Sequence, residues 1–231
     1  MRSGTALLLL TCLLPASSNA QSSDDKDDRR VVVTRGEAIV RRAPDRALLI
    51  LATEVRAPQP AQAQQRNAEM MSAVQQTLQG LVPADAIRTL AYTLQEEFEY
   101  VNDRRVSRGY RAANTIEVRV DDLPQLGRII DAAVESGATN VHNIQFELKD
   151  RDGAEREALR LAVADARGRA EAAAAGANLQ LAGVVRIEEQ GRAVPMVSMA
   201  RMEMDAARAE TPIAPGEIEI RATVMLTAEI R

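Results

Sequence analysis

The sequence predicts an α+β fold, and three observations support this prediction. Several segments carry an apolar residue at every second position, which is the pattern of a half-buried strand. Six alanines lie at strict four-residue intervals in a segment without proline, which is typical of a helix packed closely on its neighbour. The predicted elements follow the order β-β-α-β-β-α-β-α-β-β. Because hairpins and single crossovers are combined in this order, we expect mixed or antiparallel sheets built from ββα units.

The first half of the chain contains four predicted strands and one helix. Residues 31–41 alternate between polar and apolar side chains. Residues 46–56 are apolar at both odd and even positions, as in an interior strand. Residues 61–81 have helical spacing and are closed by Gly and Pro. Residues 87–100 and 109–121 form a hairpin around an Asn-Asp turn. The expected inner face of the helix is Met70, Met71, Val74, Leu78 and Leu81.

The second half alternates helices with strands. Residues 123–136 form a short helix that ends before a glycine, and residues 141–149 form a strand. The alanine-rich helix covers residues 152–178, and another strand covers 181–189. Apolar and polar side chains alternate most regularly in residues 217–231, so one face of that strand should be buried and the other exposed to solvent. Two successive ββα units suggest an internal repeat.

The alanine row defines the predicted packing of the long helix. A four-residue step exceeds one helical turn by about 40°, so the row should spiral by about 200° over its five steps. We therefore expect that one straight partner cannot cover the whole row and that its remaining alanines offer a second contact. Asp152 and Glu155 are spaced like a capping box at the start of this helix. The row is Ala154, Ala158, Ala162, Ala166, Ala170 and Ala174. The face expected on one core is Leu159, Ala162, Val163, Ala166, Ala170, Ala173 and Ala177.

The N-terminus divides into two predicted segments ahead of the main domain. Residues 1–20 read as a cleavable signal peptide, because Arg2 precedes a short apolar run and Ser18-Asn19-Ala20 suits cleavage. Residues 21–30 read as a disordered acidic leader, and residues 31–231 as one domain. We expect an exported, periplasmic protein with no transmembrane segment in the mature chain.

Composition excludes several classes of function. The mature chain would keep 28 of the 29 basic residues and all 33 acidic ones, a net charge of −5. This acidic balance and the 2% of aromatic residues argue against a nucleic-acid surface. Removal of residues 1–20 also removes Cys12, the one cysteine, which argues against disulfides and thiol chemistry.

Several short motifs occur in a characteristic order along the chain. They are 33–38 (Val-Thr-Arg-Gly-Glu-Ala), 43–47 (Ala-Pro-Asp-Arg-Ala), 109–112 (Gly-Tyr-Arg-Ala), 122–127, 158–176 and 215–217 (Pro-Gly-Glu). Together they resemble the SIMPL-domain family, and the likeness covers most of residues 31–231. Members of this family include periplasmic or outer-membrane-associated bacterial immunogens and a protein described as an oxidative-stress defence factor.

The resemblance implies an α+β fold, export to the periplasm, with association to the outer membrane as a further implied location, and self-assembly. It brings no agreed catalytic residues, so none is carried over to this chain. The predicted function is that of a non-enzymatic envelope protein that acts through protein contacts, as a homo-oligomer and with envelope partners. Its expected role is in envelope or oxidative-stress defence, with no cofactor. An enzyme whose site is not visible in the sequence is an alternative.

Candidate catalytic groups are few. His142, the one histidine, alternates with Ile144, Phe146 and Leu148, so we expect it on an apolar face as a core or interface residue. Carboxylates are plentiful but lie in charged runs such as Glu96-Glu97, which are typical of solvated faces. No glycine-rich phosphate loop is present.

A methionine-rich segment suggests the other alternative function. Thioethers are soft ligands that favour Cu(I), so a flexible loop could gather their sulfurs into a periplasmic copper site. Methionine also fills gaps in apolar cores, and the same segment could be a short helix that covers a sheet edge. The candidate ligands are Met196, Met199, Met202 and Met204.

Overall fold

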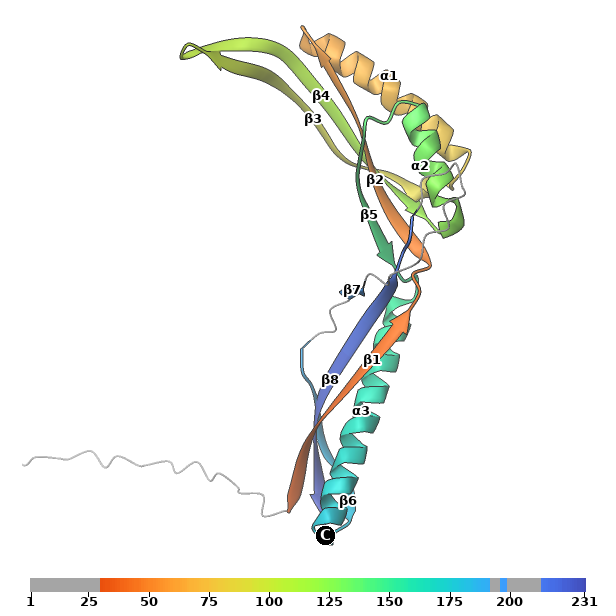
Figure 1. Ribbon diagram of the computed structural model, residues 1–231, viewed down its shortest axis with the longest axis vertical. Helices are drawn as coiled ribbons and strands as arrows, with labels where there is room; N and C mark the ends of the chain where they lie inside the picture. The colour runs from red at the N-terminus through yellow and green to blue at the C-terminus, as the bar shows by residue number, and fades with distance from the viewer. Residues whose placement is uncertain (1–29, 192–195, 199–212) are drawn as a thin grey trace, which may run out of the picture.

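The computed structural model describes residues 30–191, 196–198 and 213–231. These residues form two four-stranded sheets, joined end to end in an elongated molecule (Figure 1). All strand pairs among the described residues are antiparallel, and helices cover one face of each sheet. The predicted α+β fold and order of elements are therefore confirmed, with a short extra strand near residue 197.

The one-helix unit consists of β1, β6, β7, β8 and α3. In its sheet the strand order is β1-β8-β6, and β7 pairs with one end of β8. Side chains at every second position of β8 are buried under α3, as the alternation predicted. The bounds are β1 (Val31–Arg42), β6 (Leu181–Glu189), β7 (Met196–Ser198), β8 (Glu217–Ile230) and α3 (Arg151–Gly176).

The alanine row packs differently from the prediction. All six of its alanines are buried, and the first five belong to one core cluster with side chains of β1 and β8. Ala173 and Ala177, which we expected on the core, are exposed. The prediction of a second contact for part of the row is therefore wrong. Its error was to assume a straight partner. Strands twist in a sheet, and the twisted pair of β1 and β8 runs along α3 (Figure 1).

The small side chains of the row bring the α3 backbone against β1. A Cβ atom added at Gly36 would overlap the Ala162 carbonyl oxygen and the Ala166 amide nitrogen, and would lie 2.7 Å from the Ala166 Cβ. The Thr34 hydroxyl donates to the Ala166 carbonyl at 2.7 Å. The Glu37 amide donates to the Asp165 carboxylate at 3.0 Å and lowers the pKa of that group. Helix and strand thus touch backbone to backbone.

The start of α3 also differs from the prediction. Asp150 is the N-cap residue, and its carboxylate accepts the Gly153 amide at 2.9 Å. Asp152 lies within the first turn instead. The predicted capping box at Asp152 and Glu155 is therefore wrong, because the N-cap lies two residues earlier, at Asp150. Glu155 forms an ion pair with Arg151, one helical turn earlier.

Replacement of Asp150 by alanine tests this cap. We expect Asp150→Ala to lower the free energy of unfolding by about 1 kcal/mol, because the Gly153 amide loses its acceptor. Asp152→Ala, the matched control, should cost about 0.3–0.5 kcal/mol through the helix dipole alone. Urea denaturation followed by circular dichroism measures both. A larger loss for Asp152→Ala than for Asp150→Ala would contradict the assignment.

The two-helix unit contains the other four strands. Its strand order is β3-β4-β2-β5, so β2 is an interior strand, as its apolar sequence predicted. The hairpin turn lies at Asn102 and Asp103, whose φ angles are 50° and 60°. The bounds are β2 (Arg46–Ala57), β3 (Ile87–Val101), β4 (Arg104–Val120) and β5 (Asn140–Glu147).

Two α-helices cover one face of this sheet: α1 (Pro60–Gln79) and α2 (Leu126–Glu135). Two short 3₁₀ turns, Ala84–Ala86 and Leu123–Gln125, lie in the connections. The expected inner face of α1 is confirmed at its centre, but Ala63 and Asn67 extend it toward the N-terminus. The largest fully buried side chains of this core are Leu49, Leu51, Val74, Leu78, Ile116, Val118, Val120, Leu126 and Ile129.

Candidate functional site

The β3-β4 hairpin carries four of the five aromatic residues of the sequence. Tyr92, Phe98 and Tyr100 are exposed, with 46%, 43% and 68% of their surface accessible. Exposed aromatic side chains are costly to leave in water and are enriched at protein interfaces. Their concentration on one hairpin therefore marks this hairpin as a candidate contact surface.

Strand alternation places four exposed apolar or aromatic side chains on one side of β3, with the exposed Glu96 between them. We call them the hairpin surface: Tyr92, Leu94, Phe98 and Tyr100. The hairpin extends beyond the end of β2, so its tip has no helix beside it (Figure 1). Phe98 and Tyr100 meet edge to face, with ring centroids 6.0 Å apart. Arg105 lies over the Phe98 ring at 3.7 Å, which orders the tip further.

Two ion pairs within the molecule lie beside the hairpin surface. Arg105 contacts Glu96 at 3.5 Å, and Arg108 forms an ion pair with Glu99. Because these two pairs of charges cancel, they add no net charge beside the hairpin surface, although the chain as a whole is acidic.

The outer edge of β3 is poorly suited to binding another strand. Among the described strands, β3 pairs with β4 alone. The β3-β4 pairing is shifted twice, between Thr89 and Ala91 and between Glu97 and Phe98. Such irregularities, together with charged side chains, protect edge strands from accidental pairing. The contact chemistry of the hairpin therefore resides in its side chains.

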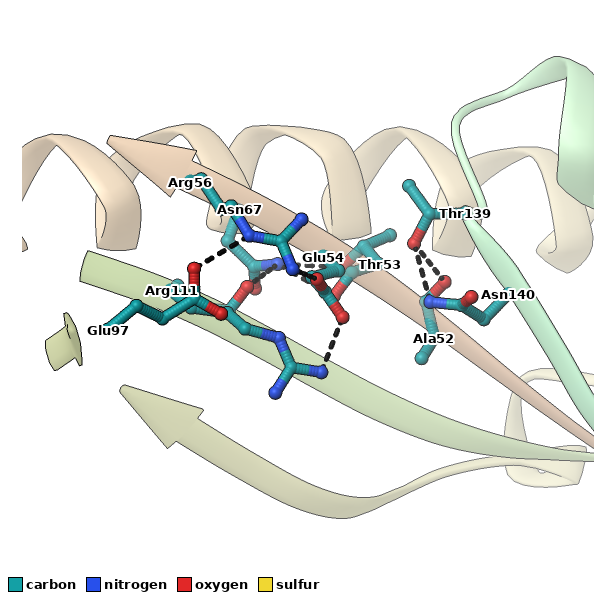
Figure 2. A network of polar contacts seen from close by, with 10 residues as sticks. Ala52, Thr53, Glu54, Arg56, Asn67, Glu97, Arg111, Thr139 and Asn140 are labelled. Atoms are coloured by element: carbon teal, nitrogen blue, oxygen red, sulfur yellow. Dashed lines mark hydrogen bonds and ion pairs between the residues drawn. The ribbon is translucent and has the colours of Figure 1, made fainter. Parts of the chain in front are cut away.

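The opposite face of the sheet bears a network of ion pairs around Glu54 (Figure 2). An Arg111 guanidinium nitrogen lies 2.5 Å from the Glu54 carboxylate, and Arg56 bridges Glu54 at 2.9 Å to Glu97 at 2.8 Å. The hydrogen bond from Arg111 lowers the pKa of Glu54. A carboxylate held ionised between two guanidiniums is a poor general acid or base near neutral pH. The network therefore serves structure better than catalysis.

A buried polar contact joins α1 to the same sheet, on its covered face. Asn67 is fully buried, and its Nδ2 donates to the Thr53 carbonyl at 2.9 Å, the Thr53 hydroxyl at 3.0 Å and the Ala112 carbonyl at 3.2 Å (Figure 2). The sequence interpretation missed this residue. One signal was available, because Asn67 lies four residues from both Ala63 and Met71 on the buried row of α1.

His142 does not lie where its alternation predicted. The residue is exposed on β5, an edge strand. The pairing of β5 with β2 shifts between Ile50 and Leu51, so Asn143 and Val141 take consecutive partners and His142 is the extra residue of a bulge. A bulge breaks the two-residue period on which the prediction relied. His142 is therefore neither a core residue nor part of a buried catalytic group.

The other candidate groups do not converge on a site. Within the described ranges, no three His, Cys, Asp or Glu side chains are placed to hold a metal ion. A surface hollow at the start of α3 is lined by residues that include Glu155, Arg156, Leu159 and Glu189, with no nucleophile beside a base. Met199, Met202 and Met204 lie outside the described residues, and Met196 belongs to β7. The copper alternative thus stays a prediction.

The described helices include none that is long and apolar enough to cross a membrane. The fold and its surfaces define a two-sheet α+β protein whose most distinctive exposed feature is an aromatic hairpin.

Sequence comparison identifies the family. The SIMPL family model, described as a protein of unknown function (DUF541), matches residues 32–228. This chain belongs to the SIMPL family.

Named relatives are similar over most of their length. The chain is 28% identical over 214 residues to the 26 kDa periplasmic immunogenic protein of Brucella melitensis, covering 87% of this chain and 85% of that protein. It is 28% identical over 183 residues to the uncharacterized protein YggE of Escherichia coli K12, covering 76% of this chain and 72% of that protein. It is 27% identical over 161 residues to the uncharacterized protein YggE of Edwardsiella ictaluri, covering 68% of this chain and 66% of that protein. The names describe an immunogen and uncharacterized proteins, and one of them gives a periplasmic location.

Proposed function

We propose that this SIMPL protein is a non-enzymatic protein of the bacterial periplasm that assembles with copies of itself and contributes to envelope or oxidative-stress defence. Residues 1–20 serve as its export signal, residues 21–30 as a leader and residues 31–231 as the SIMPL domain. The periplasmic name of the Brucella relative supports the location. The observation that carries the proposal is the hairpin surface, where the exposed aromatic side chains gather.

A second copy of the chain is a suitable partner for this surface. Two copies of a like-charged patch would repel, but the charges beside the hairpin surface are paired within each copy. Aromatic rings attract one another in stacked or edge-to-face pairs, so Phe98 and Tyr100 of one copy can pack on those of another. Arg105 already holds Phe98 in place, which reduces the entropy that association would cost.

The double variant Phe98→Ser with Tyr100→Ser tests the assembly. We expect the native protein at tens of micromolar to sediment as an oligomer and the double variant to dissociate with at least a tenfold higher dissociation constant, because the aromatic anchors are lost. Analytical ultracentrifugation measures both. The matched control is Val134→Ser, which removes an exposed apolar side chain of α2 outside the hairpin.

Two outcomes would contradict this proposal. One is a monomeric native protein at tens of micromolar, and the other is an unchanged dissociation constant in the double variant. The cellular role is tested separately with a deletion strain exposed to peroxide. We expect the native gene and Val134→Ser to restore survival and the hairpin variant to fail. Equal survival of the deleted and native strains would refute the defence role without affecting the assembly result.

A further inference from the structure

The two units are joined by short segments with few apolar contacts. Three described segments run between them: residues 43–45, 148–150 and 214–216. The buried residues of the two units form separate core clusters. Leu148 packs on the core of the one-helix unit and Ile213 on that of the two-helix unit, so neither side chain joins both. Neither core therefore extends across the junction, where polar contacts join the segments.

Asp121 gathers three cations at the end of β4. Arg46 at the start of β2 donates to its Oδ1 at 2.8 Å, and Arg119 lies 3.4 Å from its Oδ2. Lys149, in the segment between β5 and α3, donates to the Asp121 carbonyl at 3.1 Å and lies 3.7 Å from Oδ1. The hydrogen bond from Arg46 lowers the pKa of Asp121, so the carboxylate is ionised at neutral pH.

The same lysine connects two of the junction segments. The Lys149 amide donates to the Asp45 carboxylate at 2.7 Å, and the Asp45 amide donates to the Glu147 carbonyl at 3.1 Å. Asp150, the next residue, caps α3. Lys149 therefore contacts Asp45 through its backbone and Asp121 through its side chain, immediately before the helix of the other unit begins.

We infer that the side-chain contact of Lys149 with Asp121 forms a junction latch that fixes the orientation of the one-helix unit relative to the two-helix unit. Without the latch, the units rotate about the short segments while each core stays intact. The latch thereby sets the direction in which the hairpin surface points relative to α3. This inference does not depend on what the hairpin surface binds.

Distances between spin labels on the two units test the latch. The labels are attached to Gln76→Cys in α1 and Ala172→Cys in α3, both exposed, in a full chain that carries Cys12→Ser. In the parent protein, pulsed electron–electron double resonance should give a narrow distribution of the distance between the two labels. Asp121→Asn removes the carboxylate charge, and Lys149→Met removes the ammonium group while keeping the aliphatic length. We expect each variant to widen the distribution at least twofold.

Two checks make the measurement decisive. Glu97→Gln breaks the Arg56 ion pair inside the two-helix unit and should leave the distribution unchanged. Circular dichroism reports whether each variant keeps its native fold, and Lys149→Met decides the result if Asp121→Asn is unfolded. Distributions as narrow as the parental one in folded Lys149→Met would overturn the latch, as would equal widening by Glu97→Gln.

Discussion

Gly36→Ala is expected to lower the free energy of unfolding by about 3 kcal/mol or more. The added Cβ would overlap backbone atoms of Ala162 and Ala166, which cannot move aside as a flexible side chain could. Overpacking in a well-packed core costs about 1–3 kcal/mol even when side chains can adjust. Here α3 must shift away from β1, so contacts along the alanine row would be weakened as well.

Gly168→Ala is the matched control for this prediction. Gly168 lies in α3, and nothing lies within 4 Å of the position that its Cβ would occupy. Because alanine is the better helix former, this variant should gain up to about 1 kcal/mol. Urea denaturation monitored by circular dichroism gives both values. If Gly36→Ala were as stable as Gly168→Ala, the backbone contact between α3 and β1 would be refuted.

Asn67→Asp should have a comparable effect at neutral pH, about 3 kcal/mol of lost stability. The exchange preserves shape but replaces an amide donor by a carboxylate oxygen that faces the Thr53 and Ala112 carbonyls. Of the three groups that Asn67 Nδ2 contacts, the Thr53 hydroxyl alone can donate to the new carboxylate. The buried charge is therefore strongly penalised, and the penalty is relieved when the group takes up a proton. The folded-state pKa of this aspartate should therefore lie well above its unfolded value of about 3.9.

This raised pKa gives the variant a pH dependence of known sign. Below the unfolded pKa the carboxyl is neutral in both states and ionisation costs nothing. As the pH rises from about 4, the unfolded state loses its proton first, so the stability of the variant falls relative to the parent by up to about 1.4 kcal/mol per unit until the folded pKa is reached. Unfolding free energies of variant and parent at pH 4 and pH 7 measure the difference.

An exposed asparagine provides the comparison for Asn67→Asp. Asn143 lies exposed on β5, and Asn143→Asp should change stability by less than about 0.5 kcal/mol at either pH. A loss for Asn67→Asp that is the same at pH 4 and pH 7 would contradict a buried, donor-poor carboxylate.

Most of the secondary structure followed from periodicity. The regular alternation over residues 217–231 predicted a strand and its buried face, because successive side chains of a strand point to the covered and the exposed face in turn. The apolar run of β2 indicated an interior position, which β4 and β5 confirm by pairing on either side. The Asn-Asp pair marked the hairpin turn, since both residues tolerate positive φ.

The candidate sites were harder to predict because they depend on partners distant in sequence. The predicted position of His142 was wrong because this residue is the extra residue of a bulge opposite β2, and no local sequence pattern indicates such a bulge. The burial of Asn67 depends on acceptors from β2 and β4, 14 and 45 residues away. The exposure of Phe98 and Tyr100 depends on how far the hairpin extends beyond the covering helices (Figure 1).

The sequence by itself determined the elements, their order and the SIMPL family, because periodicity, turn residues and short motifs are local properties of the chain. Only the tertiary structure decided how those elements meet. The alanine row is buried along its whole length, and its first five residues pack on a twisted strand pair that, unlike a straight partner, rotates with the row. The two separate cores and the junction at Asp121 were equally beyond local patterns, since each is made by residues that only the folded chain brings together.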